Sequence, residues 1–344
     1  MTKLSICIPS HRNLINSQGS IDSAISYASQ RKMVELCVSD NSGDNDKPLK
    51  YSAMQGDKLR YSLATGLNES QNWLNSANIS TGSYIGFLAD DDYLLALGPD
   101  THYQLDNNII GYRPNFAVWE KDRGIVRTNN FSIIENTARE RVEAYFKNAK
   151  GNNNTLYSFI KRDLSLDINC LVMDHHPIKG GHYDWAIVLA YVSSGNLLPD
   201  HSTLYVYDNA NWSGTQDEIN NACKSLMKKG GISERGVLFL PLLLAIDSFI
   251  LIARESSTIS RVELLEAASL AFQGYANNFL QFYSLNKSQF FQKEIMAIEA
   301  MSKTTGLSNL LNSALKIIES FEPKIIDQYR IFYLASIGKE WAKF

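Results

Sequence analysis

The chain has 344 residues, of which 44% are hydrophobic and 20% charged, so it is long enough for two or three globular domains of about 100–200 residues each. Its formal net charge is only −3, which excludes a strong basic field of the kind that attracts nucleic acid or anionic lipid. Four cysteines without paired spacing (Cys7, Cys37, Cys170 and Cys223) argue against a zinc site or a disulfide framework and fit a reducing compartment.

The first hundred residues alternate strand and helix signals. In chain order we predict the strand Leu4–Pro9, the helix Gln18–Gln30, the strands Met33–Val38 and Leu59–Leu63, the helix Asn68–Ile79 and the strand Ser83–Ala89. The first strand alternates and then stops, which is not typical of a secretory signal. Strands that alternate with helices predict a mainly parallel sheet with helices on both faces.

Polar residues directly follow three of these strands: Ser10-His11-Arg12, Ser39–Asp44 and Asp90–Asp92. Ligands of such sheets bind beyond the carboxyl ends of the strands, so we expect the three clusters to outline one site. The adjacent carboxylates of Asp90–Asp92 repel one another unless a cation or many donors neutralise them. Mg²⁺ is usually held by one or two carboxylates plus substrate phosphates. The cluster therefore predicts a metal–phosphate site; the alternative is an acidic turn that caps the next helix.

The middle of the chain is mixed and the end is helical. We predict strands at Ile109–Trp119, Gly124–Ile134, Leu156–Ile160 and Ser202–Tyr207, and helices at Thr137–Ala149 and Tyr183–Ser194. From Thr215 onward only helices are expected, including Leu307–Phe321 and Ile325–Trp341. The apolar stretch Val237–Ala253 is short for a membrane span and contains Asp247, so we predict a buried core helix, with peripheral membrane contact as the alternative.

One of these helices carries a packing seam. Its apolar residues are spaced four and three apart in alternation: Leu265, Ala268, Phe272, Tyr275, Phe279 and Phe282. A seam of this length predicts an intrachain bundle contact, and a dimer zipper is the alternative.

Three segments resemble the inverting family 2 glycosyltransferases of the GT-A fold, in particular bacterial enzymes that build O-antigen, lipopolysaccharide, capsule and other surface polysaccharides. They are Leu4-Ser-Ile-Cys-Ile-Pro-Ser-His-Arg-Asn13, Glu35-Leu-Cys-Val-Ser-Asp-Asn-Ser-Gly-Asp44 and Gly82-Ser-Tyr-Ile-Gly-Phe-Leu-Ala-Asp-Asp-Asp-Tyr-Leu94. The resemblance covers about the first 95 residues and continues weakly to Ser213. It implies an α/β class: a GT-A domain with a Rossmann-like sheet, here followed by an all-helical C-terminal region.

The resemblance also implies roles for individual residues in binding a nucleotide sugar. Pro9, Ser10, Asn68, Asn72 and Asp90 would contact the donor, and Asp40 would accept a hydrogen bond from the base, which suits uracil or thymine. Asp91 and Asp92 would hold Mg²⁺ or Mn²⁺ across the diphosphate. The family often has Asp-x-Asp-Asp here, whereas Ala89 stands at the first acidic place. Which carboxylate touches the metal stays open.

Inverting transfer also requires a base that takes a proton from the acceptor hydroxyl. The family places a carboxylate at the start of a later helix, which corresponds to Asp184 in Gly180-Gly-His-Tyr-Asp-Trp185. The alternative for Asp184 is a helix N-cap. The family's further metal ligand, commonly a histidine, has no match, and Asp208 or Asn211 would substitute. Four other histidines (His175, His176, His182 and His201) are expected in loops, without a metal.

These observations lead to a working hypothesis: a metal-dependent inverting hexosyltransferase acting on a UDP- or dTDP-sugar and a hydroxyl of a lipid-linked glycan. Residues 1–100 would bind the nucleotide sugar, residues 101–214 the acceptor, and residues 215–344 would form a helical domain. We expect a cytoplasmic protein. Peripheral contact with the inner face of the membrane would suit a lipid-linked acceptor. A homo-oligomer through the C-terminal helices is a further hypothesis. Two alternatives are a nucleotidyltransferase that makes sugar nucleotides and a non-catalytic scaffold that binds them.

Overall fold

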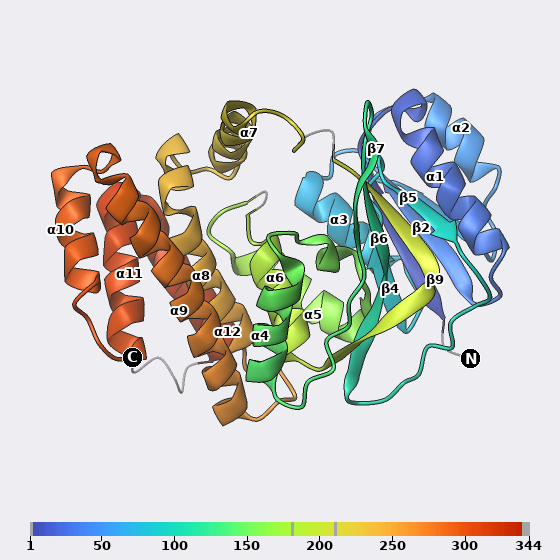
Figure 1. Ribbon diagram of the computed structural model, residues 1–344. Helices are drawn as coiled ribbons and strands as arrows, with labels where there is room; N and C mark the ends of the chain where they lie inside the picture. The colour runs from blue at the N-terminus through green and yellow to red at the C-terminus, as the bar shows by residue number, and fades with distance from the viewer. Residues whose placement is uncertain (1–2, 180–181, 210–211, 339–344) are drawn as a thin grey trace. The chain divides into compact units, whose positions relative to one another are not determined.

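The computed structural model describes residues 3–179, 182–209 and 212–338 (Figure 1). The chain forms two compact units, each assembled from three stretches of sequence. The first, called here the sheet unit, contains Met1–Ile134, Asn148–Cys170 and Gly195–Thr215. The second, called the helical unit, contains Glu135–Lys147, Leu171–Ser194 and Gln216–Phe344. The predicted division into residues 1–100, 101–214 and 215–344 assigns the nucleotide sugar to the first part and the acceptor to the second. These binding roles stay a prediction.

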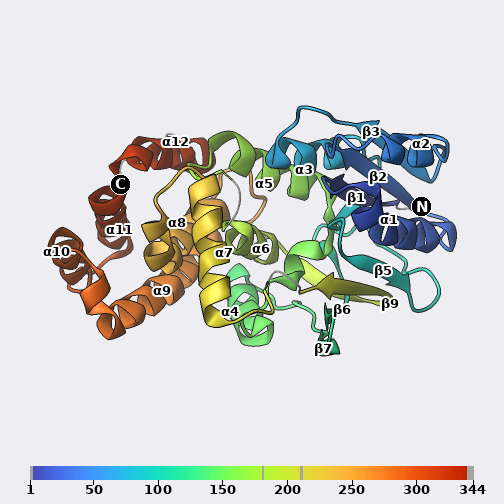
Figure 2. The same cartoon turned by 90° about the horizontal axis from the view of Figure 1, so that it is seen from above.

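One mixed sheet forms the centre of the sheet unit, with strand order β3-β2-β1-β4-β8-β6-β9-β5 and β7 paired to β6 (Figures 1 and 2). Its strands are β1 (Leu4–Ser10), β2 (Val34–Asp40), β3 (Leu59–Leu63), β4 (Tyr84–Phe87), β5 (Tyr93–Ala96), β6 (Ile109–Glu120), β7 (Gly124–Asn129), β8 (Phe159–Lys161) and β9 (Asn196–Asp208). The strands β1 to β4 are parallel, as are β6 and β9. The other pairs are antiparallel. The predicted α/β class is confirmed, but parallel pairing is confined to β1–β4 and to the pair of β6 and β9.

Helices cover both faces of this sheet, as predicted. The helix α1 (Leu14–Ser29) buries Ile21 and Ala24 in one core with Leu4, Ile6 and Ile8 of β1. On the opposite face, Ala77 of α3 (Glu69–Asn78) lies in a second core with Cys7, Cys37 and Phe87. Successive side chains of a strand point to opposite faces, so β1 supplies both cores. Cys7 and Cys37 are paired in register and are buried free thiols, as expected.

Three elements escaped sequence analysis. They are α2 (Asp46–Ser52), α5 (Arg162–His175) and the strand β5. The first contains a proline and the second begins amid charged residues, so neither has a strong helical signal. The strand β5 has only four residues and directly follows the acidic cluster, where a helix cap was the alternative. That alternative is wrong, because a strand follows Asp90–Asp92.

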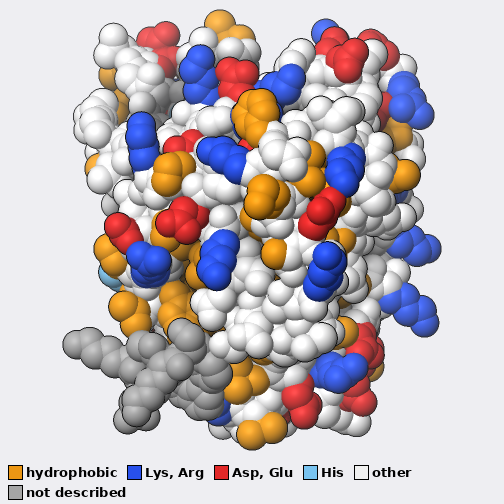
Figure 3. Space-filling model, turned by 90° about the vertical axis from the view of Figure 1, so that its left-hand side faces the viewer, with side chains coloured by type: hydrophobic (Ala, Val, Ile, Leu, Met, Phe, Trp, Pro, Cys, Tyr) orange, Lys and Arg blue, Asp and Glu red, His pale blue; other side chains and the backbone are white. Residues whose placement is uncertain are grey.

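The helical unit contains α4 (Ala138–Ala149), α6 (Asp184–Ser193), α7 (Gln216–Lys229), α8 (Leu240–Ile252), α9 (Arg261–Leu285), α10 (Gln292–Met301), α11 (Leu307–Phe321) and α12 (Ile326–Ile337), with part of α5. Within the described residues beyond Thr215 no strand occurs, as predicted. The predicted helix end at Trp341 lies outside the described residues. On the face drawn in Figure 3, basic and acidic side chains are interspersed with scattered apolar ones.

The long apolar helix is a core element. By length and hydropathy Glu234–Ile252 could cross a membrane, and it is the one such stretch among the described residues. In the structure 72% of its apolar window is buried inside the protein. The ring centroids of Phe249 on α8 and Phe272 on α9 lie 6.4 Å apart. The predictions of a buried core helix and of an intrachain seam on α9 are therefore confirmed.

A glycine in β6 tests the packing of the sheet. A Cβ atom at Gly111 would lie 2.3 Å from the carbonyl oxygen of Phe159 on the neighbouring strand β8. We expect Gly111→Ala to lower the free energy of unfolding by about 1–3 kcal/mol, because the backbone of β8 must move. Gly56→Ala is the matched control, since nothing lies within 4 Å of that Cβ. Urea denaturation measures both, and equal midpoints would contradict the prediction.

Candidate functional site

The carboxyl ends of β1 and β4 are joined through Asp90. Its Oδ2 accepts hydrogen bonds from the Ser10 hydroxyl at 2.8 Å and from the backbone N–H groups of His11 and Arg12 at 2.9 Å. Its Oδ1 accepts from the Arg12 guanidinium. Burial by itself would raise the pKa of Asp90, but the Arg12 N–H and the neighbouring charges outweigh it, and the pKa is lowered. Asp90 is therefore an ionised, buried anchor for the loop after β1.

Asp91 is the accessible member of the cluster. Its side chain is 25% exposed, against 1% for Asp90. Oδ2 of Asp91 accepts from the Arg12 guanidinium at 2.6 Å, so one arginine bridges two adjacent carboxylates. Burial raises the pKa of Asp91, and the negative charge of Asp90 adds to this effect, while the charge of Arg12 opposes it.

Asp92 serves a different part of the sheet. It is buried, and its carboxylate accepts hydrogen bonds from the Tyr205 hydroxyl at 2.6 Å and from the backbone N–H of Asp208 at 2.8 Å. These contacts tie the start of β5 to β9. Burial raises the pKa of Asp92 to about 8, although both hydrogen bonds act in the opposite direction. Both oxygens of Asp92 already accept protein donors. The predicted role of Asp92 as a metal ligand stays a prediction.

Asp40, predicted to bind the base, lies at the carboxyl end of β2 and is fully buried. It forms an ion pair with Lys47 at 2.9 Å and accepts further hydrogen bonds from the Tyr61 hydroxyl and the Ser42 N–H. Lys47 also donates to the Ser10 hydroxyl at 2.6 Å and is itself fully buried. Sequence analysis missed Lys47 because it lies on the unrecognised helix α2. Asp40 therefore already accepts three protein donors in a site closed to solvent.

The predicted asparagines differ in position. Asn72 is buried and donates to the Ser10 carbonyl at 3.2 Å and to Asn41 at 3.1 Å, so it lies among the strand ends as expected. Asn68 is exposed and caps α3: its side chain accepts from the Gln71 N–H, and Gln71 bonds back to the Asn68 N–H. This capping box gives Asn68 a structural role. Pro9, buried in β1, pairs in register with Ser39.

Asp184 belongs to the helical unit, where it is the first residue of α6 and half-buried. The N-cap position is occupied by Tyr183, so the pure capping role expected as the alternative does not describe Asp184. The charge of Asp184 contributes, after burial, to the raised pKa of Tyr275 on α9. Its role as the base stays a prediction. Gly180, Gly181 and the proposed substitute ligand Asn211 lie outside the described residues.

The histidine expectation needs a correction. His176 and His182 lie between α5 and α6, as expected of loop residues, but they are buried at 1% and 8% exposure; His175 ends α5 and His201 lies within β9, and both are exposed. Sequence analysis placed all four in loops because adjacent histidines gave no periodic signal. The fold brings α8 next to His176 and His182, and only this contact between distant segments shows that these two histidines are buried.

The acidic cluster fits a hard divalent cation through one carboxylate. The oxygens of Asp90 and Asp92 accept protein donors, and among the three acids Asp91 is the most accessible, with its Oδ2 paired to Arg12. Mg²⁺ or Mn²⁺ bound by a single carboxylate takes its remaining ligands from water and substrate phosphates. Such an ion would compete with Arg12 for Asp91.

No model of a known protein family matches the sequence, and no curated protein matches it. Among solved structures, the chain is similar to residues 1–349 of S. aureus TarS in complex with UDP-GlcNAc, at 11% identity and a TM-score of 0.44. That match covers 96% of this chain and 90% of the other. The TarS structure with UDP gives 12% identity and a TM-score of 0.42, with the same coverage. Likenesses at this level do not establish a shared activity.

Arg12 allows a test of how the acidic cluster is neutralised. We expect Arg12→Gln in EDTA to lower the free energy of unfolding by about 1–3 kcal/mol, because Asp90 stays buried with one charged donor fewer. Mn²⁺ should raise the melting temperature of this variant more than that of the wild type. Arg123→Gln, which removes an exposed pair with Glu120, is the control and should change little. An equal response of both variants to Mn²⁺ would contradict the idea.

Asp92 predicts a pH dependence of stability. The folded state holds the Asp92 proton up to a pH of about 8, whereas an ordinary aspartate releases it near 3.8. This contribution is complete below pH 3.8 and is lost as pH rises towards 8. In metal-free buffer, Asp92→Asn should therefore flatten the decline in unfolding free energy over that window. Urea titrations at several pH values measure the slope, with exposed Asp57→Asn as control; an unchanged slope would refute the assignment.

Proposed function

We propose that the protein is a metal-dependent inverting glycosyltransferase that uses a UDP- or dTDP-linked sugar. The observation that carries the proposal is the connected polar network at the carboxyl ends of β1, β2 and β4. Ser10 bonds to both Asp90 and Lys47, and Lys47 bonds to Asp40, so three clusters far apart in sequence form one network. A partly exposed carboxylate, Asp91, lies beside an arginine at the edge of this network.

Each part of this network has a task in diphosphate binding. Asp91 would hold Mg²⁺ or Mn²⁺, which neutralises charge on the departing diphosphate. Arg12, once displaced from Asp91, carries a planar set of donors suited to a phosphate oxygen. Its backbone N–H would keep its bond to Asp90, so the loop after β1 holds its place while the side chain changes partner.

The remaining chemistry is a proton transfer. Asp184 would accept the proton of the acceptor hydroxyl as that oxygen attacks the anomeric carbon on the face opposite the diphosphate. Attack on that face inverts the configuration of the sugar. The acceptor would be a hydroxyl of a surface glycan carried on a lipid, which fits a cytoplasmic enzyme that works at the inner membrane face.

The first experiment is a thermal-shift screen of UDP- and dTDP-sugars with and without Mn²⁺, followed by product analysis. We expect stabilisation by a nucleotide sugar that depends on Mn²⁺, and release of a free nucleoside diphosphate. Asp91→Asn should abolish the metal-dependent shift. Release of a nucleoside triphosphate would support a nucleotidyltransferase instead, and binding without turnover would support a scaffold.

The second experiment concerns the base. Asp184→Asn should leave the donor-induced shift nearly intact and lower the transfer rate by at least about 100-fold. The matched control is Asp217→Asn, an exposed acid in the first turn of α7, which should retain activity. Equal loss of donor binding and transfer in Asp184→Asn would show that the residue has a structural role only.

A further inference from the structure

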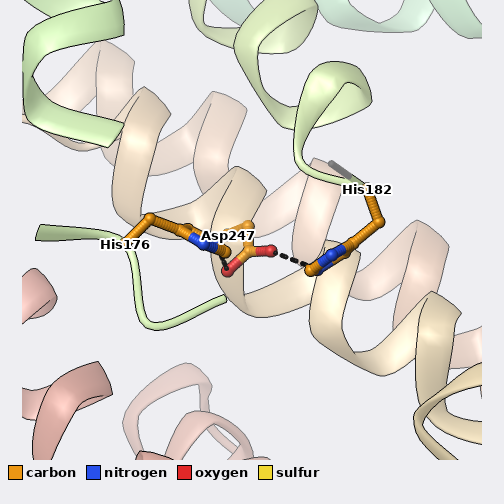
Figure 4. Close-up of side chains that lie close together, drawn as sticks. All are labelled: His176, His182 and Asp247. Atoms are coloured by element: carbon orange, nitrogen blue, oxygen red, sulfur yellow. Dashed lines mark hydrogen bonds and ion pairs between the residues drawn. The ribbon is translucent and has the colours of Figure 1, made fainter. Parts of the chain in front are cut away.

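Two histidines and one aspartate meet in the interior of the helical unit, outside the network described above (Figure 4). His176 directly follows α5, His182 lies two residues before Asp184 at the start of α6, and Asp247 lies within α8. Their exposures are 1%, 8% and 0%. Three separate stretches of chain thus bring two imidazoles and a carboxylate together away from water.

The carboxylate requires a cation. Asp247 stands in the most apolar helix of the chain, where all residues from Leu242 to Ile252 are buried. An ionised carboxylate in such a place is strongly unfavourable unless it is paired or coordinates a metal. The only groups with an ion-pair distance to it among the described residues are the two histidines.

The hydrogen bonds within the cluster are incomplete. His176 Nε2 lies 3.2 Å from Oδ1 of Asp247, yet within the described structure neither atom has a partner with hydrogen-bond geometry. The second imidazole does bond, with His182 Nε2 at 3.1 Å from Oδ2. Buried polar atoms are normally paired, so close atoms that are not directed at each other point to a missing ligand.

The donor set and its spacing fit one metal ion. Tetrahedral Zn²⁺ with ligands at its usual bond lengths holds them about 3.3 Å apart. The two imidazole nitrogens lie 3.2 and 3.1 Å from different oxygens of the carboxylate, Oδ1 and Oδ2 respectively. All three ligand atoms lie within 4.8 Å of one another, so a small closure completes the set. Two imidazoles favour zinc over Mg²⁺ or Ca²⁺. We propose that His176, His182 and Asp247 bind a structural zinc ion.

The surroundings are those of a metal-binding histidine. His176 Nδ1 lies 2.8 Å from the carbonyl oxygen of Ile178 and 3.1 Å from the Ile178 backbone nitrogen, so the Ile178 backbone holds the ring in an orientation that presents Nε2 to a metal. Phe332 and Tyr329 of α12 line the same histidine, with ring centroids 5.1 and 6.1 Å away. The fourth position of the tetrahedron remains for a water molecule or for the hydroxyl of Tyr329, a buried residue.

The zinc ion would fasten the segment between α5 and α6 to α8. This segment ends at Asp184, so the metal would hold the start of α6 in place without touching any reactant. The site does not depend on the proposed transferase activity, because all its ligands lie in the helical unit and none belongs to the acidic cluster.

The test uses the full chain and zinc itself. We expect the purified protein to contain zinc in a stoichiometric amount, and Co²⁺ added after chelation to give the visible absorption of a tetrahedral site. His182→Gln should weaken zinc affinity about 100-fold or more and remove the rise in melting temperature that zinc causes. His175→Gln, at the exposed neighbour of His176, should behave like the wild type.

The cobalt spectrum and the metal content need no variant, so a variant that fails to fold leaves the test intact. The proposal is overturned if the wild type binds neither Zn²⁺ nor Co²⁺ stoichiometrically, or if zinc stabilises His182→Gln and wild type equally.

Discussion

The sheet unit depends on how three adjacent carboxyl groups are held at the carboxyl end of β4. Asp90 is buried and ionised because the turn after β1 supplies a hydroxyl, two backbone N–H groups and the Arg12 guanidinium to it. A bare carboxylate at this position would be too unfavourable to bury. The contact fixes the end of β1 against β4, and the Lys47–Asp40 pair does the same for β1 and β2. The edge where a ligand would bind is therefore organised before any ligand arrives.

The three acids show that neighbours in sequence can serve separate purposes. Asp90 organises a loop, Asp91 faces the exterior beside Arg12, and Asp92 joins β5 to β9 through Tyr205. Their environments shift their proton affinities in different directions. Only Asp91 combines exposure with a cationic partner that another cation could replace, so the chemistry proposed for this site rests on it.

Sequence reasoning predicted the elements with a strong period and missed those without one. The strand Leu59–Leu63 was placed to the residue, and β1, β2, α1 and α3 to within a few residues, because apolar spacing and the polar ends of the strands are local signals. The antiparallel insertion of β8 between β4 and β6 depends on contacts between distant residues, so no local sequence pattern predicted it. The partners of the predicted site residues were missed for the same reason. Lys47 lies on a weak helix, and Tyr205 lies 113 residues from Asp92.

The same limit explains the histidine cluster. Asp247 looked like an interruption of an apolar stretch, and His176 and His182 looked like loop residues. Each interpretation used only the neighbouring residues in sequence. The role of the three residues depends on contacts between α8 and the residues that precede α6. A charged residue in an otherwise apolar helix is a signal that could have prompted a search for distant basic partners.

The interleaving of the two units has a consequence for any attempt to divide the protein. The chain leaves the sheet unit after Ile134 and Cys170 as well as after Thr215, so the helical unit includes segments that lie between strands in sequence. A truncation at Thr215 would keep α6 but remove α8, on which it packs. The eight buried residues of α6 from Ala186 to Ser193 would lose that cover. A shortened protein of this kind is expected to aggregate.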